Sequence, residues 1–290
     1  RDALLGRYGA ATRQTPGQRS LALSVAVPIH AGNSGSGEQK DDRRNNPQRL
    51  DTLLGKILRL EEDGGIPADN PFVGVPGARP EIWDLGVRQP FRLAFDTATG
   101  DLFIGDIGED LREEVDVHPA SQPGGMNWGW HVMEGELCSG AAQCAEHPCP
   151  APDYAAPAFA YAHENHLCCV LGGFVYHGAH VAALEGAYLY GDICTGHLYA
   201  LHLEDGRALG SEALVVLLDA GVIDDLVGVC ADGDGEPLLI DRALGAAGEG
   251  EVWRLHPGIT DLGGSLGFPS FTGQGTALAG SAITLSLGGR

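Results

Sequence analysis

Short runs of alternating apolar and polar residues recur along the chain, and turn residues separate them. Residues 91–95 (FRLAF) have the period of two that predicts a strand with one buried face. The segment 96–100 (DTATG) supplies turn residues, and its glycine can adopt a positive φ. Residues 102–104 (LFI) predict a second strand, which runs into an acidic loop at 106–110 (DIGED). The sequence therefore predicts a unit of strand, tight turn, strand and acidic loop.

This unit recurs further along the chain. Residues 185–190 lead through a Gly-Asp pair and a turn to a strand at 197–201, and residues 237–241 lead through a Gly-rich loop to a strand at 251–255. Repeated antiparallel units favour an all-β fold of the β-propeller type, because a single blade cannot bury its own faces. A sandwich of unrelated hairpins is the alternative.

The remaining segments are predicted from their composition. Residues 21–27 (LALSVAV) predict a strand, residues 31–48 a polar Gly-rich loop, and residues 61–80 a turn-rich loop. Residues 50–60 are too densely apolar to separate helix from strand. The tail, 258–290, has almost no charge after Asp261. We expect a propeller-like domain over 1–257 that lacks N-terminal blades, and a linker with the start of a truncated β module over 258–290.

Composition limits the partners. The formal net charge of −21 argues against nucleic acid or an anionic membrane surface as a partner. The longest apolar run is interrupted by Asp219, Asp224 and Asp225, so no segment is expected to span a bilayer. The chain begins at Arg1 without a methionine or a signal peptide, and is therefore expected to be processed or a fragment.

The seven cysteines in a loop-rich acidic chain predict an oxidising compartment, so we expect a secreted or periplasmic protein. The favoured pairs are Cys138–Cys144 and Cys168–Cys194. A zinc site is the alternative, although the spacing lacks paired C-x-x-C motifs. Its ligands would be these cysteines with His147, His163 and His166.

Familiar catalytic motifs are absent, since the sequence holds no G-x-S-x-G, H-E-x-x-H, Walker or Rossmann pattern in context. Arg88 and Gln89 stand at a strand start, where a guanidinium and a neighbouring amide can bind a planar carboxylate or quinone oxygen. Carboxylates and backbone carbonyls of the 106–110 loop suit calcium. If these residues have only structural roles, Arg88 is an exposed charge at a strand end and Asp106 caps a turn.

Five segments together resemble the soluble quinoprotein glucose/sorbosone dehydrogenases, a family that includes aldose sugar dehydrogenases. The likeness covers about residues 51–255. The segments, in order, are 53–72 (LLGKILRLEEDGGIPADNPF), 81–116 (EIWDLGVRQPFRLAFDTATGDLFIGDIGEDLREEVD), 124–138 (GGMNWGWHVMEGELC), 169–178 (CVLGGFVYHG) and 188–201 (YLYGDICTGHLYAL).

The resemblance implies a six-bladed propeller that holds pyrroloquinoline quinone (PQQ) on one face with calcium nearby. It also implies oxidation of the C1 hydroxyl of an aldose to a lactone, with a histidine as general base and hydride transfer to the quinone. The substrate would be a small sugar, and an external electron acceptor would reoxidise the cofactor.

Matching positions assign the site residues that this resemblance implies. Arg88 would contact the quinone, Gln89 stands where the family has Asn, and His163 falls near the cofactor wall. Gly108 and Glu109 would offer carbonyls to calcium, with Asp106 as a helper.

Other positions depart from the family. His30 is the counterpart of the family's base, which lies in an N-H-N-G-G segment, but the strand pair that should follow is missing. His177 stands where the family commonly has a basic residue, and the opening blade is absent. The erosion around His30 favours the alternative of a non-catalytic extracellular propeller that binds a protein or carbohydrate partner, similar to the Hedgehog-interacting proteins. The retention of Arg88 and of the acidic loop favours the dehydrogenase. A calcium-dependent lactonase is a third reading.

Overall fold

The computed structural model describes most of the chain between residues 10 and 286. The described residues are 10–14, 21–27, 44–141, 144–151, 153–204, 207–208, 214–218, 226–242, 251–256 and 282–286. Strands dominate them, and the helices they contain are single 3-10 turns such as η1 (Asn46–Gln48) and η3 (Ala182–Leu184). The predicted all-β class is confirmed.

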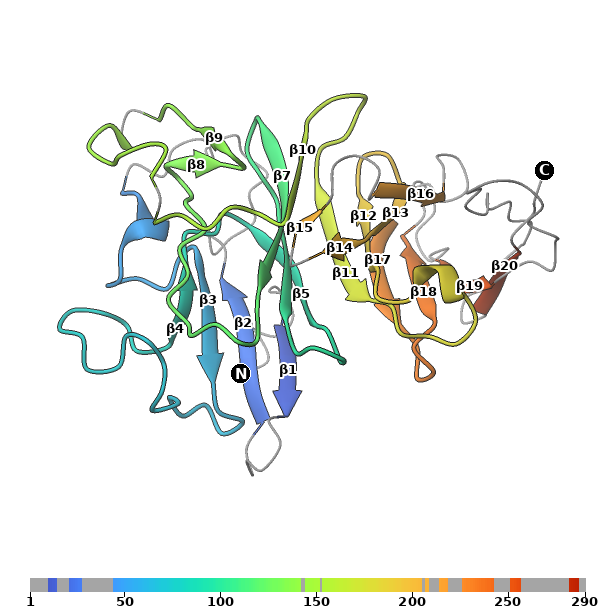
Figure 1. Cartoon of the computed structure of the whole chain (residues 1–290), viewed down its shortest axis with the longest axis horizontal. Helices are drawn as coiled ribbons and strands as arrows, with labels where there is room; N and C mark the ends of the chain where they lie inside the picture. The colour runs from blue at the N-terminus through green and yellow to red at the C-terminus, as the bar shows by residue number, and fades with distance from the viewer. Residues whose placement is uncertain are drawn as a thin grey trace. The chain divides into compact units, whose positions relative to one another are not determined.

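The first of two compact units spans residues 1–163 and contains two four-stranded antiparallel sheets. One sheet has the order β1 (Ala10–Gln14), β2 (Leu21–Val27), β3 (Lys56–Leu60), β4 (Ile82–Leu85). The other has the order β10 (Phe159–Ala162), β7 (Arg112–His118), β6 (Leu102–Asp106), β5 (Pro90–Phe95). A short hairpin of β8 (Met133–Glu134) and β9 (Leu137–Cys138) precedes β10. Strands β5, β7 and β10 of this sheet are labelled in Figure 1.

The second unit spans residues 164–290 and repeats the plan. One sheet has the order β11 (Val170–Val175), β12 (Tyr188–Asp192), β13 (Leu198–Leu201), β16 (Leu214–Leu218). The other has the order β17 (Leu226–Ala231), β18 (Pro237–Asp241), β19 (Glu251–His256), β20 (Ala282–Ser286), with β20 parallel to β19. A two-stranded hairpin joins β14 (Leu203–Glu204) to β15 (Arg207–Ala208). Consecutive strands pairing within small sheets is the arrangement expected of propeller blades.

The simple alternation expected for residues 91–95 is not observed. The register of β5 against β6 shifts between Pro90 and Leu93, and Arg92 has a φ of 87°. A β-bulge inserts an extra residue and moves the following side chains to the other face. Leu93 is therefore buried while Phe91 and Phe95 are only half-buried. The turn that follows is as expected, with Gly100 at a φ of 81°.

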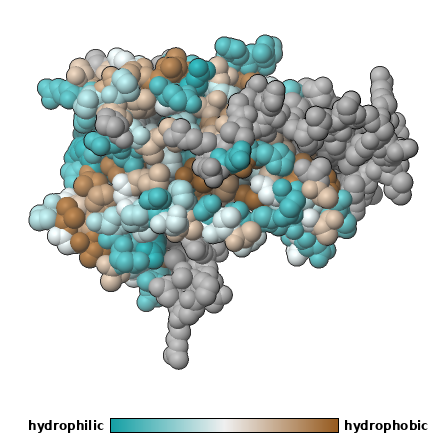
Figure 2. Space-filling model, in the orientation of Figure 1, coloured by the Kyte–Doolittle hydropathy of each residue, from teal (hydrophilic) through white to brown (hydrophobic). Residues whose placement is uncertain are grey.

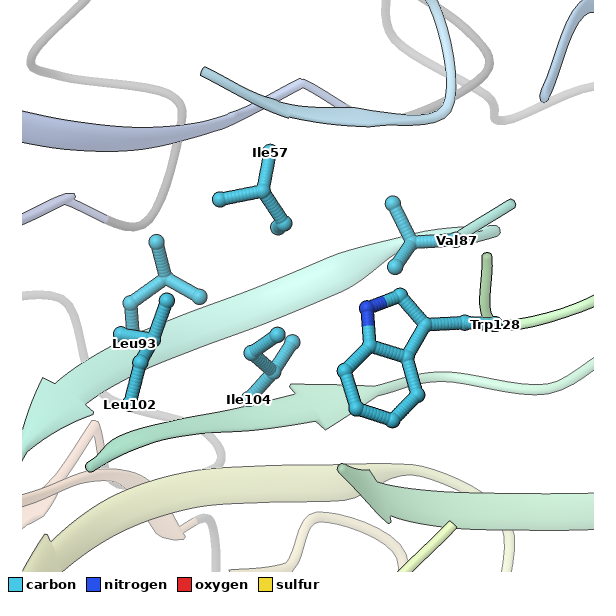
Figure 3. Close-up of a cluster of buried hydrophobic side chains, with 6 residues drawn as sticks. All are labelled: Ile57, Val87, Leu93, Leu102, Ile104 and Trp128. Atoms are coloured by element: carbon cyan, nitrogen blue, oxygen red, sulfur yellow. The ribbon is translucent and has the colours of Figure 1, made fainter. Parts of the chain in front are cut away.

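An apolar cluster fills the space between the two sheets of the first unit. Figure 3 shows its members converging from β3, β5, β6 and two loop segments: Ile57, Val87, Leu93, Leu102, Ile104 and Trp128. Burial of one such aliphatic side chain stabilises the fold by about 1.5–3 kcal/mol. Val87 directly precedes Arg88, so this core fixes the backbone from which the Arg88 side chain projects.

A buried lysine fixes the same backbone from the other direction. Lys56 in β3 is fully buried, and its Nζ donates hydrogen bonds to the carbonyls of Asn46 (2.8 Å), Pro47 (2.9 Å) and Leu54 (2.9 Å). The Pro47 carbonyl in turn accepts the N–H of Gly86 at 3.2 Å. The ammonium group therefore ties the η1 segment to the chain that leads into Arg88.

The surface shows mixed polarity. On the face drawn in Figure 2, apolar and polar residues are interspersed. The exposed large apolar side chains include Ile66, Val73 and Val75, all on the predicted 61–80 loop. No helix within the described ranges is long and apolar enough to cross a membrane.

Candidate functional site

The loop between β4 and β5 is fastened to the end of β6 by one carboxylate. Asp106 accepts the backbone N–H of Arg88 on Oδ2 at 2.8 Å and that of Gln89 on Oδ1 at 2.6 Å. The N–H of Ile107 returns to the Gln89 carbonyl at 3.2 Å. Both Asp106 oxygens thus hold the Arg88–Gln89 turn in place, as the turn-cap interpretation of this residue expects.

The Arg88 side chain lies against the acidic loop. It is 6% exposed, its Nη1 donates to the Ile107 carbonyl at 3.1 Å, and its Nη2 lies 3.9 Å from Glu109 Oε1. Its guanidinium carbon lies 5.5 Å from the ring centroid of Trp130. Within the described residues, Arg88 Nε is buried and has no hydrogen-bond partner. A buried donor of this kind is costly unless a ligand or water completes it.

The loop that follows Ile107 wraps around the carboxylate of Glu134. Glu134 Oε1 accepts the four consecutive N–H groups of residues 109–112, at 2.6, 2.9, 2.9 and 3.2 Å. Gly108 allows this turn, because a Cβ at that position would overlap the Arg112 carbonyl and approach Glu134. When the amides of a loop converge on one anion, its carbonyls are turned away from that anion and toward a cation or solvent.

Trp130 and His131 form the side of the site that faces Arg88. Their rings are stacked with centroids 4.5 Å apart. His131 Nε2 lies 4.0 Å from Glu109 Oε2, and His131 is 3% exposed. The aromatic pair therefore shields the guanidinium and the Glu109 carboxylate from water, which strengthens charge interactions there.

His163, just after β10, is joined to β7. Its Nε2 lies 2.6 Å from Glu113 Oε1, and Glu113 is fully buried. The hydrogen bond with Glu113 raises the pKa of His163, with smaller contributions from the charges of Glu134 and Asp110. The pair with Glu113 therefore favours the protonated form of His163.

Several carboxyls along β6 and β7 are buried, and burial raises their pKa values. Burial raises the pKa of Asp106 to about 7, although the two backbone N–H groups it accepts oppose the shift. Burial also raises the pKa of Glu114 and of Asp116 well above the usual range. The charges of Asp116 and Asp106 add to the shift of Glu114, and those of Asp106 and Asp84 add to the shift of Asp116. These buried carboxyls therefore hold their protons more strongly than free carboxyls do.

The structure gathers most of the predicted site residues in the first unit. Arg88, Gln89, Asp106 and Glu109 are in direct contact, as described above, and His163 joins the same sheet. His30, the predicted base, lies outside the described residues. The roles of Trp130, His131 and Glu134 were not predicted; the available signal was their place in the 124–138 segment that carries the family resemblance.

One predicted disulfide is confirmed and one is wrong. Cys168–Cys194 forms as expected. Cys138 pairs with Cys149 instead of Cys144, with a Cα–Cα distance of 5.8 Å. Cys144 is buried with its Sγ 3.3 Å from the His131 carbonyl.

The zinc alternative is not assembled by the described residues. His147 contacts Asn45 and His163 contacts Glu113. Among the described residues, the group of side chains close enough to share a metal ion consists of Cys168, Cys169 and Cys194, without a histidine.

Comparison with known families and proteins gives a consistent result. The family model described as Glucose / Sorbosone dehydrogenase matches residues 33–227. The HIPL2 protein of Arabidopsis thaliana is 32% identical over 190 residues, which is 58% of this chain and 27% of that protein. Aldose sugar dehydrogenase YliI of Escherichia coli (strain K12) is 36% identical over 91 residues, which is 31% of this chain and 24% of that protein. The chain spans about a quarter of the length of these curated relatives.

Solved structures support the fold. A glucose dehydrogenase crystal structure aligns with a TM-score of 0.60 at 25% identity, covering 80% of this chain and 60% of that one. The PQQ-bound form of aldose sugar dehydrogenase from Streptomyces coelicolor aligns with a TM-score of 0.53 at 20% identity, covering 80% and 57%. The propeller-type fold predicted from the repeated strand units is confirmed by these neighbours.

Proposed function

Because the chain belongs to the glucose/sorbosone dehydrogenase family, we propose that it carries the cofactor side of a PQQ-dependent sugar dehydrogenase. The proposed reaction oxidises the C1 hydroxyl of an aldose to a lactone, and an external acceptor takes the electrons. The observation that carries the proposal is the Arg88 guanidinium. It is buried, stacked near Trp130, and keeps an Nε without a partner among the described residues.

The residues present fit PQQ at its quinone end. A guanidinium offers planar, directed donors that match a quinone or carboxylate oxygen, and it stays charged at all relevant pH values. The Gln89 amide is adjacent in sequence, and its backbone is fixed by Asp106 at 2.6 Å. His163 adds a second cation, because Glu113 raises the pKa of His163 and favours the imidazolium. With Nε2 on Glu113, His163 would help to hold the anionic groups of the cofactor.

Calcium would be held by the carbonyls of Gly108 and Glu109. Glu134 collects the N–H groups of the following residues, which leaves the carbonyl side of the loop for a cation. Oxygen ligands in an irregular loop suit calcium, which tolerates flexible coordination. Asp106 is a weaker candidate, since both of its oxygens already accept backbone hydrogen bonds.

The chain's own groups would divide the work of the reaction. His30, the proposed base, would take the proton of the C1 hydroxyl on a ring nitrogen. When bound, PQQ supplies the two-electron oxidation by accepting the hydride from C1. Arg88 would stabilise negative charge on the oxygen it contacts, in a site where Trp130 and His131 exclude water. The two disulfides favour a secreted or periplasmic location for this chemistry.

The test is a turnover assay on the purified chain. The chain is reconstituted with PQQ and calcium, glucose is added with an artificial electron-accepting dye, and dye reduction is followed. We expect dye reduction that depends on the sugar. His30→Ala should abolish it. His202→Ala, the same exchange at a histidine elsewhere in the chain, should not. Sugar-independent reduction, or equal rates with His30→Ala, would contradict the proposed chemistry.

A second candidate function is favoured by the matches to HIPL proteins, which are 32% and 30% identical to this chain. It is a non-catalytic extracellular propeller that binds a protein or carbohydrate partner. The two candidates differ in the cofactor, because a binding propeller needs none. Saturating PQQ and calcium that leave the cofactor spectrum unchanged would favour this second function.

A further inference from the structure

Three cysteine sulfurs meet where β11 begins and β12 ends, in the second unit. Cys168 and Cys194 form a disulfide, and Cys169 keeps its thiol. The three Sγ atoms all lie within 4.8 Å of one another. A thiol is therefore next to a disulfide whose two sulfurs it can reach by small side-chain movements.

One carboxylate holds the backbone of all three cysteines. Asp192 is fully buried, and its Oδ2 accepts the N–H of Cys168 at 3.0 Å and that of Cys169 at 3.1 Å. Its Oδ1 accepts the N–H of Cys194 at 3.1 Å. The N–H of Ile193 also binds the Cys169 carbonyl at 3.0 Å. These bonds involve only backbone groups of the cysteines, so they persist whichever two sulfurs are joined.

We propose that these three sulfurs form a thiol–disulfide exchange site, in which Cys194 pairs alternately with Cys168 and Cys169. The Cys169 thiol first loses its proton to solvent. Its thiolate attacks Cys194 Sγ, a Cys169–Cys194 bond forms, and the Cys168–Cys194 bond breaks. Cys168 leaves as a thiolate and takes up a proton. The step conserves electrons and thiols, and it needs no external oxidant.

The surroundings make Cys194 the reactive end. Cys194 is exposed, whereas Cys168 and Cys169 are half-buried. Attack on Cys194 avoids a bond between the adjacent Cys168 and Cys169. Because the Cys194 residue is exposed, an aliphatic thiol from solution can approach it, so the site has the chemistry to form mixed disulfides with small thiols. The buried Cys144, in contrast, is expected to be inert.

The exchange has a structural consequence. Cys169 directly precedes β11, which begins at Val170, and Val170 pairs with Asp192. Moving the cross-link from Cys168 to Cys169 shifts it one residue closer to the strand. Either bond closes the same pair of strands, so the sheet order β11, β12, β13 is retained in both isomers.

The experiment maps disulfides in the oxidised, non-reduced chain. Samples held at pH 5 or pH 8.5 are alkylated with N-ethylmaleimide and digested, and fragment ions between the adjacent cysteines locate the label. We expect label on Cys169 at pH 5. At pH 8.5 a second population appears with label on Cys168, and its rate of formation rises about tenfold per pH unit below the thiol pKa. The total thiol count stays constant. Label on Cys169 alone at both pH values would overturn the proposal.

Two matched variants extend the test. Cys168→Ser is expected to form a Cys169–Cys194 disulfide on oxidation, and Cys169→Ser to keep Cys168–Cys194 at every pH. Cys230→Ser serves as a control with one thiol fewer and unchanged exchange. Oxidised Cys168→Ser in which both Cys169 and Cys194 remain alkylated would also overturn the proposal. The wild-type mapping decides the question even where a variant folds poorly.

Discussion

The anchoring of the 109–112 loop by Glu134 provides the sharpest structural prediction. Glu134 is 2% exposed, and its Oε1 accepts four backbone N–H groups between 2.6 and 3.2 Å. Replacing it with alanine leaves these donors without their acceptor. An unsatisfied buried N–H costs about 1–3 kcal/mol, but these amides are only partly buried and water reaches some of them. We therefore expect Glu134→Ala to lower the local stability of this loop by about 3 kcal/mol in total.

Hydrogen exchange of the loop amides measures this quantity directly. It reports the free energy of local opening, which suits a chain with two compact units better than a single global transition. A loss of about 3 kcal/mol corresponds to roughly 100-fold faster exchange at residues 109–112. Glu134→Gln keeps an oxygen acceptor without the charge, so its effect should be about half as large.

A matched exchange provides the control. Glu136→Gln, two residues along, removes an exposed carboxylate and should leave the loop's exchange unchanged. If the amides of residues 109–112 exchange as slowly in Glu134→Ala as in the wild-type chain, the loop is held by something other than this carboxylate. The proposed calcium-facing carbonyls would then lose their structural basis.

Gly108→Ala should weaken calcium binding at least about tenfold in calorimetric titration, since a Cβ there overlaps a backbone carbonyl, whereas Gly233→Ala, which meets open space, should not. Lys56→Met should lower the free energy of unfolding in urea by about 3–5 kcal/mol, because one buried and two partly buried carbonyls lose their donor; a loss under about 1 kcal/mol would refute that role. Glu113 raises the pKa of His163, so the stability from this pair is present below the unfolded pKa near 6.5 and is lost as pH rises through the higher folded value. His163→Gln should flatten that pH dependence, and an NMR titration that finds no raised pKa would contradict it.

Local sequence patterns predicted the strands well. The runs at 21–27, 237–241 and 251–255 appear as β2, β18 and β19, with bounds that differ by at most one residue. Alternation and turn residues act over a few positions, so they can be read from a single sequence. The bulge at Arg92 could not be predicted from the sequence, because it depends on how β5 pairs with β6.

Residues that act through distant contacts were harder to predict. Arg88, Gln89 and the 106–110 loop were found because their types and order carried both a chemical rationale and a family likeness. Glu134 acts on amides that precede it by 22 to 25 residues, and no local pattern marks such a pair. The pairing of Cys138 with Cys149 was missed for a related reason. The bond joins cysteines 11 residues apart although Cys144 is closer in sequence, so spacing along the chain did not indicate the partner.

A spectroscopic titration of PQQ into the chain with calcium tests the central claim that Arg88 receives the cofactor. We expect a saturable change in the cofactor's absorbance. We also expect the Kd to rise about 30-fold to 100-fold in Arg88→Gln, because a charge-assisted hydrogen bond of about 2–3 kcal/mol is lost. Arg79→Gln, which removes an exposed arginine, should bind as the wild-type chain does. If the wild-type chain leaves the spectrum unchanged, or if Arg88→Gln binds with equal affinity, Arg88 does not hold the cofactor.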